Sequence, residues 1–311
     1  MCLKHKILVI VGPTTSGKST LAIKLAKKFS ARGGPALGWN GAEIVSADSR
    51  QIYRGMDIGT GKVTKTEQKQ AKHWLIDIIS PKTNFSAAQF KKLTDKKIED
   101  IVKRGKLPII VGGTGFWIKA VIDNIKFPEV KPDWNLRKKL KRKPTVSLFK
   151  MLQNLDPDRA AEIDQFNKVR LIRAIEIARA LGKVPHFKPL AKREVLQIGV
   201  SWPREILSQR IKIRLDKRFR QGMTKEAAQL HNRGISWQRL ESFGLEYRWI
   251  ARYLQKKMPL KEMKEKLFQE IKNYAKRQMT WFNKDKRIHW IKNQKQAESL
   301  AKNFLQNKWI E

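Results

Sequence analysis

The segment that most constrains this 311-residue chain lies near its start, where Gly12-Pro13-Thr14-Thr15-Ser16-Gly17-Lys18-Ser19 fits the pattern G-x-x-x-x-G-K-[ST]. The apolar run over residues 7–11 is rich in β-branched side chains and predicts a strand buried on both faces. Apolar side chains four residues apart predict a helix over residues 18–29. A strand, a glycine-rich turn and a helix in this order is the context in which the pattern forms a phosphate-binding loop, or P-loop.

Each residue type in this loop has a physical role in holding phosphate. Successive backbone N–H groups converge on phosphate oxygens, and the helix dipole adds about half a positive charge at the same point. Gly12 and Gly17 permit the turn and the close approach of the ligand, Lys18 neutralises phosphate charge, and Ser19 is a candidate Mg²⁺ ligand. The pattern therefore predicts a phosphate site. The structural alternative is a glycine turn that only joins a strand to a helix.

Further strands and helices alternate up to about residue 122. Apolar runs predict three more strands, over residues 43–47, 75–79 and 107–111. Ser86 is placed as the N-cap of a helix over residues 87–103, and the glycine-rich segment 31–41 reads as an exposed loop. Such alternation is typical of a parallel sheet with helices on both faces. We therefore predict an α/β fold, with a P-loop-type parallel sheet flanked by helices.

The pattern changes beyond residue 122, where residues 123–195 are rich in basic side chains and helical in period. A helix is predicted over residues 170–181, with Gly182 as the glycine that ends it. Further elements are predicted as a strand over 195–200, helices over 203–221, 245–257 and 259–282, and a strand over 287–291. We therefore predict a catalytic core of residues 1–122 and 196–311, interrupted by a helical, basic insertion domain over residues 123–195.

The charge of the chain indicates a polyanionic partner. Lys and Arg number 67 against 28 Asp and Glu, a net charge of +39. An excess of this size is typical of a protein that binds nucleic acid or an anionic membrane, although a lysine-rich proteome would raise it as well. No apolar run is long enough to span a bilayer, so we expect no membrane anchoring. The single cysteine, Cys2, excludes an internal disulfide and fits a cytoplasmic location.

A second polar cluster follows the strand predicted over residues 43–47. Asp48, Ser49, Arg50 and Gln51 stand together there, at the carboxyl edge where α/β sheets bind ligands. A carboxylate in this place can hold Mg²⁺ or act as a general base, and a glutamine can read the edge of a nucleobase. The structural alternative for Asp48 is the N-cap of a helix.

Five motifs together resemble one known family, the tRNA dimethylallyltransferases (tRNA isopentenyltransferases). They are Gly12–Ser19, Asp48–Tyr53, Gly55–Lys62, Val111–Gly115 and Lys276–Phe282, and the resemblance spans residues 7–291 in the same order. The resemblance implies transfer of a dimethylallyl group from dimethylallyl diphosphate to N6 of the adenosine directly 3′ of the anticodon, giving N6-isopentenyladenosine. It also implies that the P-loop and Mg²⁺ hold the diphosphate leaving group.

The resemblance implies roles for single residues as well. Asp48 is the base that orients the amine and takes its proton, Thr114 contacts the reacting adenosine, and Arg214 contacts the diphosphate. The structural alternatives are a helix cap for Thr114 and, for Arg214, a solvated basic face shared with Arg210 and Arg218. The family's diphosphate contacts fall on Gly12, Pro13, Thr14, Thr15, Ser16, Gly17, Lys18 and Ser19.

The family's tRNA contacts map onto several separate stretches of the chain. Aromatic side chains interleaved with cations suit the single-stranded loop of an anticodon stem-loop. The alternative for Trp281 is a core aromatic, and Asn283 stands where the family commonly has arginine. The matching positions are Asp48, Ser49, Arg50, Gln51, Thr114, Arg137, Lys168, Val169, Arg170, Leu171, Ile172, Phe243, Gly244, Leu245, Glu246, Tyr247, Arg248, Lys276, Arg277, Gln278, Met279, Thr280, Trp281, Phe282 and Asn283.

Three other functions share parts of this pattern. A nucleotide kinase or NTPase uses the same loop but turns over ATP, and an adenylate-type isopentenyltransferase acts on free nucleotides. A non-catalytic RNA-binding module would not need Asp48. The basic insertion and the Lys276–Phe282 motif favour a tRNA substrate, so we expect dimethylallyl diphosphate and the tRNA anticodon stem-loop as partners of a monomeric enzyme.

Overall fold

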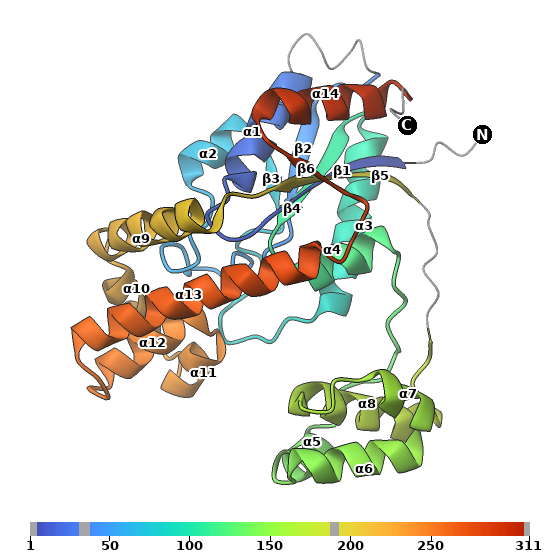
Figure 1. Cartoon of the computed structure of the whole chain (residues 1–311), viewed down its shortest axis with the longest axis vertical. Helices are drawn as coiled ribbons and strands as arrows, with labels where there is room; N and C mark the ends of the chain where they lie inside the picture. The colour runs from blue at the N-terminus through green and yellow to red at the C-terminus, as the bar shows by residue number, and fades with distance from the viewer. Residues whose placement is uncertain (1–4, 31–37, 187–192, 308–311) are drawn as a thin grey trace. The chain divides into compact units, whose positions relative to one another are not determined.

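The computed structural model of the protein describes residues 5–30, 38–186 and 193–307 (Figure 1). The chain divides into two compact units, one formed by residues 1–124 and 191–311 and the other by residues 125–190. The predicted insertion covers the smaller unit and a few residues on either side of it. Most of the glycine-rich segment predicted as an exposed loop, residues 31–37, lies outside the described residues.

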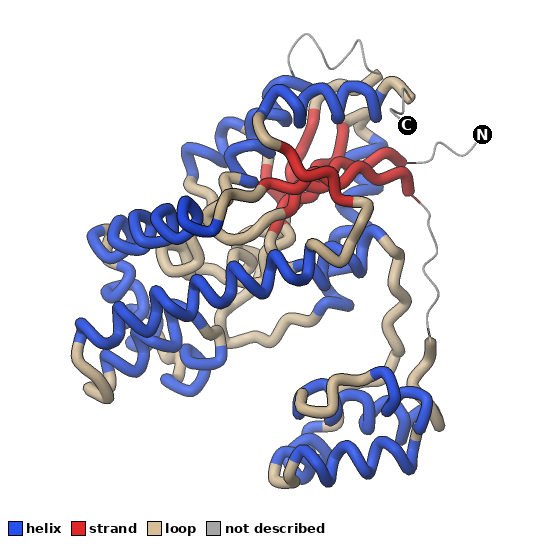
Figure 2. The backbone as a smooth tube through the Cα atoms, in the orientation of Figure 1, coloured by secondary structure: helices blue, strands red, loops and turns tan. Residues whose placement is uncertain are grey.

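The larger unit is built on a six-stranded sheet in the order β3-β2-β4-β1-β5-β6, and all neighbouring strands run parallel (Figure 2). The strands are β1 (His5–Val11), β2 (Ala42–Ser46), β3 (His73–Trp74), β4 (Leu107–Gly112), β5 (Arg193–Val200) and β6 (Ile288–Ile291). In register, Val11 lies beside Gly112 of β4 and Gly199 of β5. The carboxyl ends of the three central strands therefore meet at one edge, as the α/β prediction requires.

Alternate residues of β1 face two separate hydrophobic cores. Ile7, Val9 and Val11 belong to one core, and Leu8 and Ile10 belong to the other. The second core is closed by α1 (Lys18–Ser30) and α14 (Gln294–Leu305), which lie side by side in Figure 1. This two-sided burial explains the unbroken apolar run of the strand.

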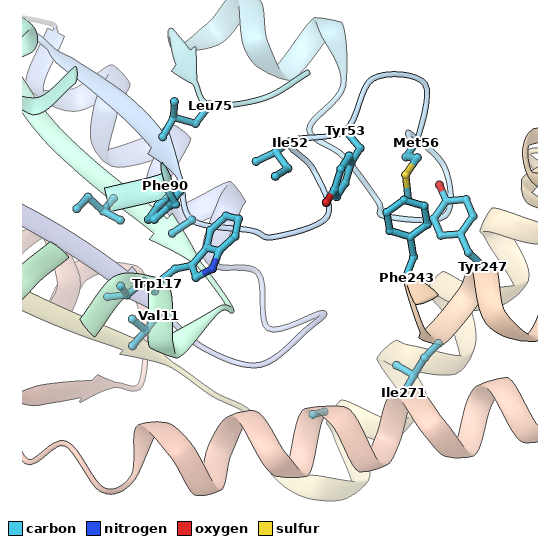
Figure 3. Close-up of a cluster of buried hydrophobic side chains, with 14 of the residues drawn as sticks. Val11, Ile52, Tyr53, Met56, Leu75, Phe90, Trp117, Phe243, Tyr247 and Ile271 are labelled. Carbon is cyan, nitrogen blue, oxygen red and sulfur yellow. The ribbon is translucent and has the colours of Figure 1, made fainter. Parts of the chain in front are cut away.

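The first core extends from the sheet into a layer of helices. These are α3 (Ala87–Lys103), α4 (Gly115–Ile122), α9 (Arg204–Arg220), α10 (Met223–Asn232), α11 (Trp237–Ser242), α12 (Leu245–Leu254) and α13 (Leu260–Phe282). Figure 3 shows how aromatic side chains continue this core away from the sheet. Phe90 stacks on Trp117 at 4.3 Å, and Tyr53 meets the ring of Phe243 edge-on at 4.9 Å.

Most predicted elements are confirmed, and one predicted strand is wrong. Ser86 caps α3 through a capping box with Gln89, as predicted from the sequence. The apolar run over residues 75–79 forms no strand: β3 is only two residues long, and Leu75 and Asp77 have positive φ values of 60° and 56°. This segment instead bonds to the turn after β2, because the backbone N–H groups of residues 78 and 79 both donate to the carbonyl of Ile52. The short α2 (Lys65–Gln70) precedes it.

The smaller unit is helical and has its own core. Its helices are α5 (Trp134–Lys141), α6 (Thr145–Leu155), α7 (Pro157–Glu162) and α8 (Lys168–Leu181). The core packs Leu140, Leu148, Leu152, Leu171 and Ile175, all with at most 2% of their surface exposed. Helix α8 ends at Gly182, whose φ is 80°, as predicted.

In the described part of the chain, no helix combines the length and the apolar character that crossing a membrane would take.

Candidate active site

The P-loop joins β1 to α1 at the carboxyl edge of the sheet. Only glycine fits at position 12, because a Cβ atom there would lie 2.3 Å from the carbonyl oxygen of Val200. Gly17 has a φ of 95°, in the region that favours glycine. The Nζ of Lys18 donates to the carbonyl of Pro13 at 3.0 Å, so this lysine folds back over the loop. The loop therefore has the glycine turn that the sequence predicts, with the Lys18 side chain lying against it.

Gln278 on α13 ties the P-loop to the end of β4. Its Oε1 accepts a hydrogen bond from the backbone N–H of Thr14 (2.8 Å), and its Nε2 donates to the carbonyl of Gly113 (2.9 Å). A Cβ atom on Gly113 would lie 2.3 Å from that same Nε2. The side chain is buried, and it bonds to the protein on both sides of the candidate phosphate site.

Two residues from the segment after β5 brace the P-loop from another side. The indole N–H of Trp202 donates to the carbonyl of Ser16 at 2.8 Å, and Nε of Arg210 donates to the carbonyl of Thr15 at 3.0 Å. The Arg210 guanidinium also stacks over the Trp202 ring at 4.9 Å. These bonds fix the carbonyls of Thr15 and Ser16, so the loop is held from the α9 side as well as by Gln278.

Asp48 lies just after β2 and is fixed by its own turn. Its Oδ1 accepts hydrogen bonds from the backbone N–H groups of Arg50 (2.9 Å) and Gln51 (3.4 Å). No described helix begins at this residue, so the alternative of a helix N-cap is wrong for Asp48. The turn holds the carboxylate at the carboxyl edge of the sheet, where the P-loop also lies.

Thr114 joins the ends of β2 and β4. Its Oγ1 accepts a hydrogen bond from the N–H of Ser49 (3.1 Å), and its own N–H donates to the carbonyl of Ala47 (3.3 Å). Thr114 precedes α4, but its side chain makes no capping hydrogen bond to that helix. Thr114 is thus the N-cap residue of α4 by position, as the alternative has it, while its side chain positions the segment that carries Asp48.

Lys18, Asp48 and Arg214 form one electrostatic cluster. Burial lowers the pKa of Lys18 to about 8, while the Asp48 carboxylate acts to raise this pKa and the Arg214 guanidinium to lower it. Burial and the neighbouring Arg218 lower the pKa of Arg214 to about 10, against the opposing effect of Glu246 and Asp48. Burial and mutual repulsion disfavour the charged forms of these two side chains. A bound polyanion would offset both effects, so the cluster is a favourable binding site for one.

Two arginines of α9, Arg214 and Arg218, face the protein, whereas Arg210 on the same helix is exposed. Arg214 donates to the carbonyl of Gly61 at 3.2 Å, as does Nε2 of Gln51 at 3.5 Å. Arg218 is buried and pairs with Glu246 at 2.8 Å. The alternative of a solvated basic face is therefore wrong for these two arginines.

Several predicted tRNA contacts have buried side chains, and these predictions need correction. Glu246 is paired with Arg218, Gln51 bonds to the carbonyl of Gly61, Gln278 bonds to the P-loop and the end of β4, and the others pack into the hydrophobic cores. The side chains that offer little surface to RNA are those of Gln51, Leu171, Ile172, Phe243, Glu246, Tyr247, Gln278 and Phe282. The apolar residues are included because they lie within motifs that match the family. Their helical spacing, however, predicts that their side chains face the core.

Arg137 is also engaged inside its own unit. Its guanidinium donates through two nitrogens to the carboxylate of Glu176, at 2.9 and 2.7 Å, and that carboxylate is 2% exposed. Arg173 pairs with the same carboxylate. Arg137 thus forms an internal ion pair, and its side chain keeps 23% of its surface exposed, so its tRNA contact stays a prediction.

The remaining predicted contacts keep accessible surface. Trp281 is 38% exposed, although it also packs on Gly115, where a Cβ atom would lie 2.1 Å from the ring. Arg248 is partly exposed and pairs with Glu270. The exposed or half-exposed positions are Ser49, Arg50, Lys168, Val169, Arg170, Gly244, Leu245, Arg248, Lys276, Arg277, Met279, Thr280, Trp281 and Asn283.

Sequence reasoning missed Trp202 and Tyr274. Tyr274 lies one turn before Gln278 on α13, and burial together with the Asp48 carboxylate raises the pKa of its phenol to about 12. The four-residue spacing from Gln278 was a usable signal for Tyr274. Nothing in the sequence pattern singles out Trp202, whose role depends on its contact with Ser16.

The oxygen ligands near the P-loop fit Mg²⁺ only in combination with a phosphate ligand. Among the described residues, no group of three or more His, Cys, Asp or Glu side chains is placed to hold a metal ion. Ser19 lies in the first turn of α1, and Asp48 is the nearby carboxylate. One or two hard oxygen ligands from protein, with phosphate oxygens and water completing the shell, is the arrangement Mg²⁺ prefers.

Comparison with known proteins gives a consistent result. Residues 51–285 match the family model described as IPP transferase. The chain is 41% identical over 298 residues to tRNA dimethylallyltransferase 1 of Syntrophus aciditrophicus, covering 93% of this chain and 94% of the relative.

Solved structures extend the comparison to the fold. The full-length tRNA isopentenylpyrophosphate transferase of Bacillus halodurans is 33% identical, with a TM-score of 0.72 and 98% of each chain covered. A eukaryotic dimethylallyltransferase acting on tRNA is 24% identical and shares the fold with a TM-score of 0.84, covering 99% of this chain and 81% of that one.

Proposed function

Because the chain belongs to the IPP transferase family, whose curated members are named tRNA dimethylallyltransferases, we propose that it is a tRNA dimethylallyltransferase. It transfers the dimethylallyl group from dimethylallyl diphosphate to N6 of the adenosine directly 3′ of the anticodon. The observation that carries this proposal is the shared electrostatic site of Lys18 and Asp48. A phosphate-binding cation and a fixed carboxylate at one sheet edge suit a reaction that releases diphosphate and a proton.

The P-loop side of the site holds the leaving group. The allylic C–O bond breaks as negative charge develops on the departing diphosphate, so groups that stabilise this charge lower the barrier. Lys18 and Arg214 are already held by hydrogen bonds to the carbonyls of Pro13 and Gly61 before the substrate binds. Mg²⁺ bound by Ser19 and the phosphate oxygens would add further charge neutralisation when present.

On the other side of the site, the Asp48 carboxylate binds the amine and takes its proton. The new C–N bond forms as N6 attacks the allylic carbon, and the proton lost from N6 goes to the Asp48 carboxylate. Hydrogen bonds from Arg50 and Gln51 occupy Oδ1, which leaves Oδ2 as the oxygen that accepts from the amine. Thr114 keeps this segment aligned with the end of β4.

The tRNA partner is supported by charge and by exposed side chains. The net charge of +39 suits a large polyanion, and Lys276, Arg277 and Trp281 give α13 both cations and an exposed ring. Phe166 (82% exposed) and Val169 (77% exposed) stand beside Arg170 on the smaller unit. We propose that these surfaces bind the anticodon stem-loop and that the target adenosine leaves its stack to reach Asp48.

The test is transfer of label from radiolabelled dimethylallyl diphosphate to unmodified tRNA. We expect the wild-type enzyme to label the tRNA. After that tRNA is digested to nucleosides, all of the label should be in N6-isopentenyladenosine. Consumption of ATP without transfer would favour a nucleotide kinase or NTPase, and a higher kcat/KM on AMP than on tRNA would favour the adenylate-type enzyme. Light scattering of the purified protein tests the accompanying proposal that it acts as a monomer, and fractionation of cells tests its cytoplasmic location.

A further inference from the structure

A buried carboxylate on α10 organises the loop between residues 57 and 61. The Oε2 of Glu226 accepts hydrogen bonds from the backbone N–H groups of Asp57 (2.8 Å) and Ile58 (2.7 Å). Its Oε1 accepts from the N–H of Gly59 (2.9 Å) and from the hydroxyl of Tyr247 (2.7 Å). Each carboxylate oxygen thus has two donors, so the full hydrogen-bonding capacity of this anion is used.

The surroundings of Glu226 leave this loop little freedom. Tyr247 is 2% exposed and belongs to the same core as Met56 and Phe243, which are labelled with it in Figure 3. A Cβ atom on Gly59 would lie 2.7 Å from the Tyr247 ring, so the loop backbone is pressed against this side chain. Burial, and after it the Glu226 carboxylate, raises the pKa of the Tyr247 phenol, which keeps the hydroxyl a donor.

The same loop carries the carbonyl groups that hold two arginines of α9. The carbonyl of Gly61 accepts from Arg214 (3.2 Å), and that of Gly59 accepts from Arg218 (3.3 Å). A Cβ atom on Gly61 would lie 1.8 Å from a guanidinium nitrogen of Arg218 and 2.2 Å from one of Arg214. The position of the loop therefore decides where the Arg214 guanidinium lies.

We propose that Glu226 is a positioning residue for the diphosphate site, acting through loop 57–61 on Arg214. The inference rests on the proposed function, since Arg214 is the proposed diphosphate contact. Glu226 itself bonds to backbone N–H groups and to Tyr247, and so it acts on the ligand only through the loop. The N–H groups of residues 57–59 donate to the carboxylate on α10, while the carbonyls of Gly59 and Gly61 accept from α9, so the loop links the two helices.

The test is a double-mutant cycle between Glu226→Gln and Arg214→Ala, read as the Kd for inorganic diphosphate measured by calorimetry. Glutamine keeps the shape of the side chain but places an NH₂ donor against N–H donors, so the loop shifts. We expect Glu226→Gln to weaken binding about tenfold in the wild-type background and less than about twofold in the Arg214→Ala background. Glu265→Gln, an exposed glutamate on α13, is the matched control and should change nothing.

Each outcome decides the proposal. An unchanged Kd in Glu226→Gln, or the same tenfold loss with and without Arg214, would overturn it, because a general loss of stability acts equally in both backgrounds. Should Glu226→Gln fail to fold, Tyr247→Phe removes a single donor to the same carboxylate, and we expect a smaller loss that again vanishes without Arg214. A wild-type protein that binds diphosphate but transfers no dimethylallyl group would refute the proposed function and leave this inference standing.

Discussion

Lys18 offers a prediction in which the pH dependence of substrate binding follows from one pKa. Burial lowers the pKa of this lysine from 10.5 to about 8 in the free protein. The bound diphosphate needs the protonated form, so affinity should be nearly constant up to about pH 7 and fall as the pH rises through the pKa of about 8. With a pKa of about 8, the protonated fraction drops from about nine-tenths at pH 7 to about one-tenth at pH 9.

The expected change is about a tenfold rise in Kd between pH 7 and pH 9, or about 1.4 kcal/mol. Dimethylallyl diphosphate is the suitable ligand, because phosphate groups lose their last proton near pH 6 and its charge is then constant over this range. Arg214 has a pKa of about 10 and stays protonated up to pH 9, which is why the series ends there. Calorimetry at fixed Mg²⁺ and ionic strength measures the Kd at each pH.

The matched control is Lys18→Met, which keeps an unbranched side chain without a titrating group. We expect this variant to bind weakly and with no change in Kd between pH 7 and pH 9. A wild-type Kd that stays constant over the same range would refute the reasoning, as would an equal pH dependence in Lys18→Met.

Three further predictions test other parts of the site. Asp48→Asn keeps an oxygen that accepts from the N–H groups of Arg50 and Gln51 but removes the base. The rate of transfer in a single turnover should therefore fall by about 10²–10⁴, while the Kd for dimethylallyl diphosphate, measured by calorimetry, stays within about twofold. Arg170→Ala and Lys276→Ala should each weaken tRNA binding and lower the slope of log K against log salt by about one, and an unchanged slope would exclude a phosphate contact. Arg137→Ala leaves the buried Glu176 with fewer donors, so it should lower the free energy of unfolding by about 1–3 kcal/mol in a denaturant titration, while a fall in tRNA affinity at unchanged stability would support the predicted tRNA contact.

Elements whose structure is determined by neighbouring residues in the sequence could be predicted from the sequence. The strand over residues 7–11, the P-loop and the helix that follows are specified by consecutive residues, and the structure has them as β1, the loop and α1. The cap at Ser86 and the end of α8 at Gly182 are local in the same sense. The apolar run over residues 75–79 shows the limit, because its burial comes from packing against the turn after β2 and not from pairing in the sheet.

Residues whose role depends on distant contacts could not be predicted in this way. Glu226 meets its partners in the loop at residues 57–59, far away in the sequence, and in the sequence it is one of many charged residues on a helix. Arg137 matched a family position, but its partner Glu176 lies on another helix and only the structure shows the pair. Asp48 and Lys18 were predictable as a pair because Asp48 lies just after β2 and Lys18 ends the loop after β1, and the carboxyl ends of parallel strands share an edge of the sheet.

The most direct test of the account is a single-turnover experiment with Asp48→Asn, loaded with labelled dimethylallyl diphosphate and mixed with excess unmodified tRNA. If Lys18 and Asp48 serve opposite halves of one reaction, the variant binds both substrates at wild-type affinity and label enters the tRNA at least about a hundredfold more slowly. Transfer at the wild-type rate would show that Asp48 takes no proton from the amine and would contradict the account.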